Sequence, residues 1–166
     1  MNKNKKEAAF IAIYAKDFQP WLKVKDIEEE SKVKKVNLVL MLNRWDGYTG
    51  FPGGLIELGE DNITGAIRET FEEIDYKILN SNSLKHISTN VLPEITVYLY
   101  AIEVSVIEIF NIQKNLTNAI DYGSEIMGSN LVILNDLKDN KGFFTFKKTP
   151  MPKKVLKDLE ILRKLI

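Results

Sequence analysis

The order of hydrophobic and polar positions along the chain predicts strands that alternate with helices. Residues 7–16, 36–44 and 95–104 are apolar runs of strand length, rich in β-branched and aromatic side chains. The run at 36–44 is almost uninterrupted, which indicates a strand covered on both faces. Shorter extended segments are expected at residues 76–79, 84–89, 131–134 and 143–146.

Three segments carry apolar residues at the spacing of an amphipathic helix. They are residues 61–75, residues 106–119 and the segment that follows Pro152. Asp61 is expected to cap the first helix, because a carboxylate accepts hydrogen bonds from the free amides of the first turn. Elsewhere proline, glycine and mixed charge predict loops or turns. These are residues 17–35, 46–47, 51–54, 123–125 and 136–142.

The chain has 166 residues, which suits one domain over residues 1–166, with residues 1–6 as a frayed polar tail. It has no cysteine and a single histidine, which excludes a disulfide, a thiolate metal site, a cysteine nucleophile and a multi-histidine zinc site. No apolar stretch is long enough to span a membrane, and the N-terminus lacks the apolar core of a signal peptide. We therefore expect a soluble cytoplasmic protein.

The polar side of the helix at 61–75 carries Arg68, Glu69, Glu72 and Glu73. Residues three and four apart share a helix face, so these carboxylates repel one another unless a counter-charge is present. A divalent cation such as Mg²⁺ or Mn²⁺ supplies one, because hard ions prefer carboxylate oxygens. The alternative is a solvated acidic face. The paired glycines just upstream, which let the backbone approach a ligand closely, favour the metal site.

The same stretch resembles the Nudix box, in which a glycine and a glutamate precede a helix bearing an arginine and three further glutamates. The matching residues are Gly54, Glu60, Arg68, Glu69, Glu72 and Glu73. Three positions depart from the pattern, since Thr70 and Tyr76 replace aliphatic residues and Asp75 replaces a glycine at the helix end. No chemical group is lost. Thr70 and Tyr76 can still pack, and Asp tolerates the left-handed conformation better than most residues.

Two further segments, residues 40–57 and 121–128, resemble one branch of the Nudix family, the small-nucleolar-RNA decapping enzymes and inosine diphosphatases. Together with the box, the resemblance covers most of residues 8–165. It implies an α/β fold, a Nudix-type α/β/α sandwich with a central mixed sheet between helices. Many members of the branch are homodimers, so a homodimer is expected here as well.

The resemblance also implies roles for single residues. The metal ligands would be the carboxylates of Glu69, Glu73 and Glu72 and the carbonyl of Gly53. Glu72 could instead be the general base, and Arg68 would orient the cluster by pairing with Glu60. Glu125 would bind another metal ion or position the attacking water, and the alternative for it is a polar residue in a turn.

Three other residues match positions that contact the nucleotide in the branch. Arg44 and Phe51 are two of them, with a solvated charge at a strand end and a core aromatic as the respective alternatives. Phe10 stands where the branch carries a histidine that contacts the base. His86 lies two residues from the place of a second histidine and is interpreted as a surface or core residue. The preferred base therefore stays open.

The resulting hypothesis is metal-dependent hydrolysis of a pyrophosphate bond in a nucleoside diphosphate linked to another group. A first rival is decapping of RNA, which needs a basic surface. Residues 138–166 hold nine Lys or Arg against three Asp or Glu, but a solvated face explains this equally well. A second rival is a non-catalytic module that binds nucleotide or RNA on the same fold. A small nucleotide substrate is favoured, because the chain carries no net charge.

Overall fold

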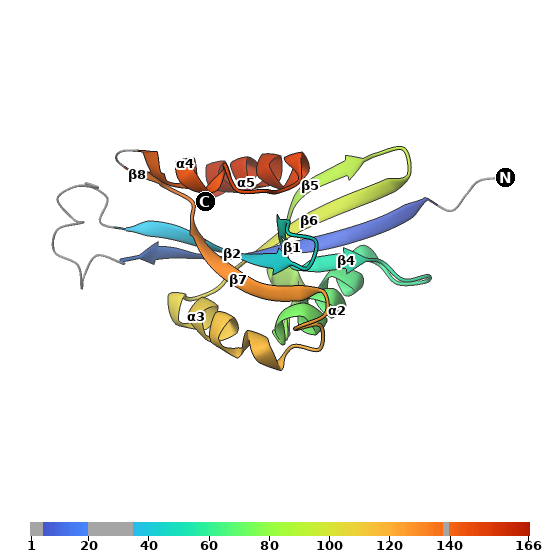
Figure 1. The fold of residues 1–166 in the computed structure, drawn as a ribbon. Coiled ribbons are helices and arrows are strands. Elements are labelled where there is room, and N and C mark those ends of the chain that lie inside the picture. Colours follow the sequence, from blue (N-terminus) through green and yellow to red (C-terminus); the bar gives the residue numbers. More distant parts are fainter. Residues whose placement is uncertain (1–4, 20–34, 138–139) are drawn as a thin grey trace.

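The computed structural model describes residues 5–19, 35–137 and 140–166, and its centre is a seven-stranded sheet (Figure 1). The strands are β1 (Lys6–Phe18), β2 (Val36–Arg44), β3 (Thr49–Gly50), β4 (Gly53–Leu55), β5 (Lys85–Val91), β6 (Ile95–Glu103) and β7 (Ile126–Ile133). Their order is β3-β2-β1-β6-β5, with β4 paired to β1 and β7 paired to β2. The β1–β6 pair is parallel and the other pairs are antiparallel, so the sheet is mixed.

Helices cover both faces of the sheet (Figure 1). One face carries α2 (Asn62–Ile74) and α3 (Val106–Asn115), and the other carries α4 (Phe143–Phe146) and α5 (Lys153–Leu165). Alternate residues of β1 point to opposite faces. Ile11 and Ile13 therefore pack with the core on the α2 side, whereas Ala12 and Tyr14 pack with the core on the α5 side. This arrangement is the predicted α/β sandwich with a central mixed sheet.

Strand β1 changes its neighbour along its length, and this change positions the site. Its residues 8–10 pair with β4, whereas its residues from Tyr14 to Phe18 pair with β2. The chain therefore leaves β1 after the pairing with β2, passes through β3, and returns to β1 as β4. Strand β2 itself is buried over most of its length, as its uninterrupted apolar sequence predicted.

Several boundaries differ from the sequence predictions. No strand forms at residues 76–79; Tyr76 instead packs against the core, and its hydroxyl donates to Glu108 of α3 at 2.8 Å. Residues 143–146 are helical rather than extended, which lets Phe143 and Phe146 both face the core. The expected loop at 136–142 contains a two-stranded sheet of β8 (Asp136–Leu137) and β9 (Lys141–Gly142). Strand β7 begins at Ile126 instead of residue 131.

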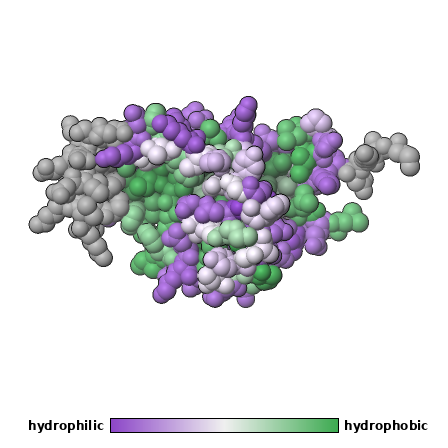
Figure 2. Space-filling model, viewed as in Figure 1, coloured by the Kyte–Doolittle hydropathy of each residue, from purple (hydrophilic) through white to green (hydrophobic). Residues whose placement is uncertain are grey.

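The helix expected at 106–119 divides into α3 and the short 3-10 helix η3 (Leu116–Asn118). A second 3-10 turn, η2 (Ser81–Ser83), precedes β5. The predicted tail and the predicted loop at 17–35 lie largely outside the described residues. Within those residues, no helix is both long and apolar enough to cross a membrane. Hydrophilic side chains gather over the outer side of α5 (Figure 2).

Candidate active site

Helix α2 begins and ends as its sequence predicts. The Asp61 carboxylate accepts hydrogen bonds from the amides of Ile63 and Thr64, at 2.9 and 3.1 Å. At the other end Asp75 adopts the left-handed conformation, with φ of 52°, and its amide donates to the carbonyl of Phe71. An aspartate thus fills the position where the Nudix pattern has glycine. The other two departures from that pattern, Thr70 and Tyr76, pack into the core region as expected.

Arg68 is the centre of an ion-pair network on α2. Its guanidinium donates to both oxygens of Glu60, at 3.2 and 3.1 Å, which is the pairing that the sequence predicted. One nitrogen donates to Glu69 at 2.9 Å and to Glu72 at 3.0 Å, and another donates to the carbonyl of Leu55 at 3.0 Å. These hydrogen bonds, above all those to Glu60, raise the pKa of Arg68 and lower the pKa of Glu60. Arg68 therefore fixes the loop before α2 to the helix.

Glu73 is the most unusual carboxyl group of the site. It is 3% exposed, and one of its oxygens accepts a hydrogen bond from the amide of Gly53 at 2.7 Å. Burial raises the pKa of Glu73 to about 8, and the negative charges of Glu69 and Glu125 add to this effect. Gly53 has φ of +134°, and a Cβ there would collide with the carbonyl oxygen of Ala9. Only glycine allows the backbone to reach Glu73 in this way.

Four side chains form what we call the carboxylate cluster, namely Glu69, Glu72, Glu73 and Glu125. Burial raises the pKa of Glu69, and the charges of Glu72 and Glu125 raise it further. Glu125 comes from the turn before β7, which is joined to β2 by a hydrogen bond from the Trp45 amide to the Glu125 carbonyl at 3.0 Å. Two segments that are distant in sequence, α2 and the turn before β7, thus place their charges close enough to influence one another.

The carboxylate cluster has the donor chemistry for a hard divalent ion, since all of its donors are oxygens and one of its members, Glu73, is kept from water. In the described part of the chain, however, no three acidic, histidine or cysteine side chains are already arranged around an ion position. The reason is that Arg68 engages Glu69 and Glu72 while Glu73 is bonded to Gly53. The residues therefore fit Mg²⁺ or Mn²⁺ chemically, and Glu69 and Glu72 would have to turn from Arg68 to bind it.

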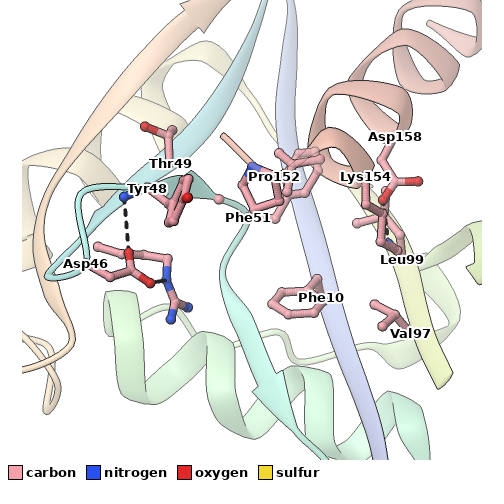
Figure 3. Close-up of a pocket in the computed structure, with 13 residues that line it drawn as sticks. Phe10, Asp46, Tyr48, Thr49, Phe51, Val97, Leu99, Pro152, Lys154 and Asp158 are labelled. Carbon is pink, nitrogen blue, oxygen red and sulfur yellow. Dashed lines mark hydrogen bonds and ion pairs between the residues drawn. The ribbon is translucent and has the colours of Figure 1, made fainter. Parts of the chain in front are cut away.

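A pocket of about 290 Å³ opens on the α5 side of the sheet (Figure 3). All three residues that the sequence predicted to contact a nucleotide line it, namely Arg44, Phe51 and Phe10. Phe51 is 6% exposed and belongs to the core as well as to the pocket wall, so both interpretations of this residue describe part of its environment. Arg44 forms an ion pair with Asp46 at 3.3 Å.

Arg44 also connects the pocket with the carboxylate cluster. It lines the pocket, and its positive charge acts to lower the pKa of Glu73 against the larger effect of burial. The backbone of residues 51–54 makes the same connection, because Phe51 lines the pocket while the amide of Gly53 donates to Glu73. A molecule in the pocket would therefore have the carboxylates at one end.

His86 lies apart from this pocket. Its ring contacts Tyr100 edge to face, with ring centres 5.7 Å apart, and its Nε2 is 2.8 Å from the hydroxyl oxygen of Thr89. The residue is exposed, so of the two alternatives drawn from the sequence, a surface or a core residue, the structure shows the first. Sequence reasoning missed Lys154 and Asp158, which line the pocket from α5. Their four-residue spacing is too common on helices to have marked them.

Comparison with known proteins decides the family. The family model described as "Nudt16-like: U8 snoRNA-decapping enzyme-like" matches residues 7–150. The chain belongs to this branch of the Nudix hydrolases. Its Nudix box is the stretch from Gly54 to Tyr76, whose carboxylates and arginine form the network described above.

Curated relatives agree with this assignment, and a solved structure shares the fold. A U8 snoRNA-decapping enzyme of Homalodisca vitripennis is 37% identical over 117 residues, which are 68% of this chain and 63% of that protein. A Tudor-interacting repair regulator protein of Gallus gallus is 30% identical over 115 residues, 63% of this chain and 34% of that protein. The chain thus spans less than two thirds of either relative. A mutT/nudix family protein of Listeria innocua shares the fold, with a TM-score of 0.63 at 13% identity over 96% of this chain and 92% of that one.

Proposed function

We propose that this Nudix protein hydrolyses the pyrophosphate bond of a nucleoside diphosphate linked to another group, with a small nucleotide as substrate. The observation that carries the proposal is the position of Arg44. Its side chain lines an apolar pocket, and its positive charge favours the ionised form of Glu73. A nucleotide needs an apolar cavity for its base and charged groups for its phosphates. The pocket and the carboxylate cluster supply these at adjoining places.

The ions in this proposal are Mg²⁺ or Mn²⁺. Their ligands would be the carboxylates of Glu69, Glu73 and Glu72, the carbonyl of Gly53, and Glu125 for a further ion. When bound, such ions neutralise charge on the pyrophosphate and lower the pKa of a bound water. Arg68 then has a second function, because its network with Glu60 and Leu55 holds the helix in place when Glu69 and Glu72 turn toward the ions.

Two carboxylates are candidates for the general base that takes the proton from the attacking water. Glu72 is 32% exposed and already accepts a hydrogen bond from Arg68, so one of its oxygens can receive a proton while the other stays oriented. The other candidate, Glu125, lies on the turn before β7 rather than on α2. Arg44 would bind a phosphate, and Phe51 and Phe10 would contact the base. The products would be a nucleoside monophosphate and the phosphorylated leaving group, or free phosphate.

A substrate panel tests this function. Inosine diphosphate, ADP-ribose, dinucleoside polyphosphates, NAD and capped RNA are each incubated with the full chain and either Mg²⁺ or Mn²⁺, and products are separated by chromatography. We expect a nucleoside monophosphate from at least one small substrate and no product in excess chelator. Full hydrolysis in chelator would overturn the metal assignment, and failure of every substrate with both ions would overturn the function.

Two other functions have specific support. The 37% identical relative carries the name of a decapping enzyme, and hydrophilic side chains, many of them lysines, cover the outer side of α5 (Figure 2). Capped RNA as the best substrate of the panel would establish that function. The relative named as a Tudor-interacting protein supports a binding module, which nucleotide binding without hydrolysis would indicate.

The wider organisation of the protein also stays a prediction. A single domain over residues 1–166 should resist limited proteolysis between its elements. A homodimer should give twice the chain mass of 19.0 kDa in sedimentation analysis. Location in the cytoplasm, which fluorescence microscopy of the tagged protein would test, is expected from the sequence.

A further inference from the structure

A second cavity, of about 230 Å³, lies on the α5 side of the sheet and is separate from the pocket described above. Strand β1 contributes Phe10 to the pocket, but Tyr14 and Lys16 to the second cavity. Phe10 and Tyr14 are four residues apart on an extended strand, which corresponds to about 13 Å. The first half of α5 lines the pocket, whereas its last residues line the second cavity. The proposed hydrolysis assigns no task to this space.

The interior of the second cavity is apolar, and it exists where two neighbouring strands carry alanine. Ala12 of β1 and Ala101 of β6 stand side by side in the sheet, and both belong to the core on the α5 side. Their methyl groups are short, so the sheet is hollowed here. Ile87 lines the space from β5, and Leu162 and Leu165 line it from α5. Its volume equals that of about eight water molecules at about 30 Å³ each, enough for a short aliphatic chain.

The rim of the second cavity is positively charged. Lys85 is exposed, and its ammonium group forms no ion pair with any residue in the ranges that the structure describes. Lys16 pairs with Glu103 at 3.2 Å, and Glu103 also accepts a hydrogen bond from the Tyr14 hydroxyl at 3.2 Å. An ammonium group has three donors, so Lys16 keeps two beyond this pair. The rim therefore holds two ammonium groups beside the single carboxylate of Glu103.

We propose that the second cavity binds a small carboxylate with an apolar tail. The carboxylate meets Lys85 and Lys16 at the rim, and the tail enters the space between Ala101 and Leu162. Charge complementarity sets the sign of the head group, because ammonium groups attract an anion and repel a cation. Burial of the tail supplies the affinity, about three- to fourfold for each methylene group. The inference does not depend on the proposed hydrolysis.

Direct binding of simple carboxylates tests the inference. In isothermal titration calorimetry of the full chain, affinity should rise from butanoate to hexanoate to octanoate, by about tenfold for each pair of methylene groups. Octanol, which lacks the charge, should bind several-fold more weakly than octanoate, and octylammonium more weakly still. Absence of octanoate binding would overturn the proposal. Equal binding of octanoate and octanol would also overturn it, because the rim lysines would then have no part in recognition.

His86 reports where octanoate binds. It lines the second cavity and is the only histidine of the chain, so its ring protons give a single set of histidine signals in proton NMR. Octanoate should shift these signals with the same concentration dependence as the calorimetric titration. A saturating titration that leaves them in place would locate octanoate elsewhere on the protein and contradict the proposal.

Two variants test the tail and the head separately. Ala101→Leu fills the hollow and should lower octanoate affinity at least about tenfold. Lys85→Met keeps the aliphatic stem and should bring the ratio of octanoate to octanol affinity closer to one. The matched control is Lys157→Met, which changes an exposed lysine of α5 that does not line the second cavity. It should leave the ratio unchanged. An unchanged ratio in Lys85→Met, or an equal fall in Lys157→Met, would refute recognition by the rim.

Ala101 is 1% exposed, so a melting curve must show that Ala101→Leu is folded. If the variant is unfolded, the ratio in Lys85→Met and the signals of His86 still decide the question. The two proposals fail separately. A protein that binds octanoate at His86 but hydrolyses nothing in the substrate panel would lose only the hydrolase function. A protein that hydrolyses a nucleotide and binds no octanoate would lose only the second site.

Discussion

The two sides of the sheet contribute differently to the site. On the α2 side the carboxylate cluster takes three of its four members from five consecutive residues of one helix. On the α5 side the pocket takes its walls from β1, the segment between β2 and β4, β6 and α5. The first arrangement follows from helix geometry alone, because residues three and four apart share a face. The second exists only when the whole sheet and its last helix have assembled.

The two regions also differ in charge. The carboxylate cluster gathers like charges, and burial raises the pKa of Glu69 and Glu73. The pocket is mainly apolar and pairs its charges, Arg44 with Asp46 and Lys154 with Asp158. The carboxylates of the cluster outnumber the one cation, Arg68, that pairs with Glu69 and Glu72, which suits a further cation that arrives with the substrate. The paired charges of the pocket suit recognition by hydrogen bonds. The comparison therefore predicts that changes on the α2 side reduce turnover and changes on the α5 side alter binding.

The largest effect should come from Glu73→Gln on the α2 side. The variant keeps the size of the side chain and removes one charge from the proposed ion site. Turnover of the best substrate at saturating Mg²⁺ should fall roughly a hundredfold or more, in line with the loss of a few kcal/mol of transition-state stabilisation. Steady-state kinetics measure this change.

The control for Glu73→Gln is Glu57→Gln, which changes an exposed carboxylate in the loop before α2. Its turnover should equal that of the wild-type protein. A folded Glu73→Gln protein with near wild-type turnover would contradict the metal assignment. A variant that is unfolded would instead make Glu73 a structural residue.

On the α5 side, Phe51→Leu should raise the Michaelis constant several-fold to about tenfold, because stacking of a base on an aromatic ring contributes about 1–3 kcal/mol. Turnover should change less. The matched control is Phe143→Leu, another buried aromatic of the same core that does not line the pocket. It should lower only the melting temperature. If both variants lower stability equally and neither changes the Michaelis constant, Phe51 is a core residue only.

Sequence reasoning succeeded where structure is local. The caps of α2 at Asp61 and Asp75 follow from the chemistry of single residues, and the pairing of Arg68 with Glu60 follows from the box pattern. It failed where distant segments decide. Residues 76–79 read as a strand, but only the folded chain shows that α3 is their neighbour. Lys154 and Asp158 carried no signal, because Ser88, which donates to Asp158, is 70 residues away in the chain.

The raised pKa of Glu73 predicts how stability depends on pH in the metal-free protein. Its folded pKa of about 8 lies above the usual value of 4.5. Between these two pH values the folded state therefore holds a proton that the unfolded state has lost. This contribution to stability is complete below about pH 4.5 and is lost as pH rises toward 8. Glu73→Gln lacks this loss. In chelator its melting temperature should exceed that of the wild-type protein by a few degrees at pH 8, and by little at pH 5.

Thermal melts between pH 5 and pH 8.5 test this dependence, with Glu57→Gln as the control of unchanged slope. A melting-temperature difference that stays constant over the pH range would show that Glu73 does not titrate there. The measurement sharpens the comparison, because no such pH dependence is expected from changes in the apolar wall of the pocket.

The smallest expected effect concerns RNA and the outer surface of the α5 side. Lys147 and Lys148 lie over the ring of Phe144, at 4.5 and 4.7 Å, so aromatic and basic groups are combined there. The net charge of the chain is zero, so uncapped RNA should bind only weakly at physiological salt. If RNA is nevertheless a substrate, the logarithm of its affinity should fall with the logarithm of salt concentration by about 0.7 for each phosphate contacted. Replacing both lysines by glutamine should then flatten this slope by roughly one to one and a half units.

The control for that substitution is Lys77→Gln, because Lys77 lies over the ring of Phe71 at 5.3 Å on the α2 side. Lys77 makes the same kind of contact between an ammonium group and a ring but lies on the other side of the sheet. The salt slope of Lys77→Gln should therefore equal that of the wild-type protein. Tight, salt-sensitive binding that only the Lys147 and Lys148 substitutions weaken would favour decapping over a small nucleotide substrate. It would also extend the recognition surface on the α5 side beyond the pocket. Equal weakening by Lys77→Gln would show a general charge effect and leave the small nucleotide as the better substrate.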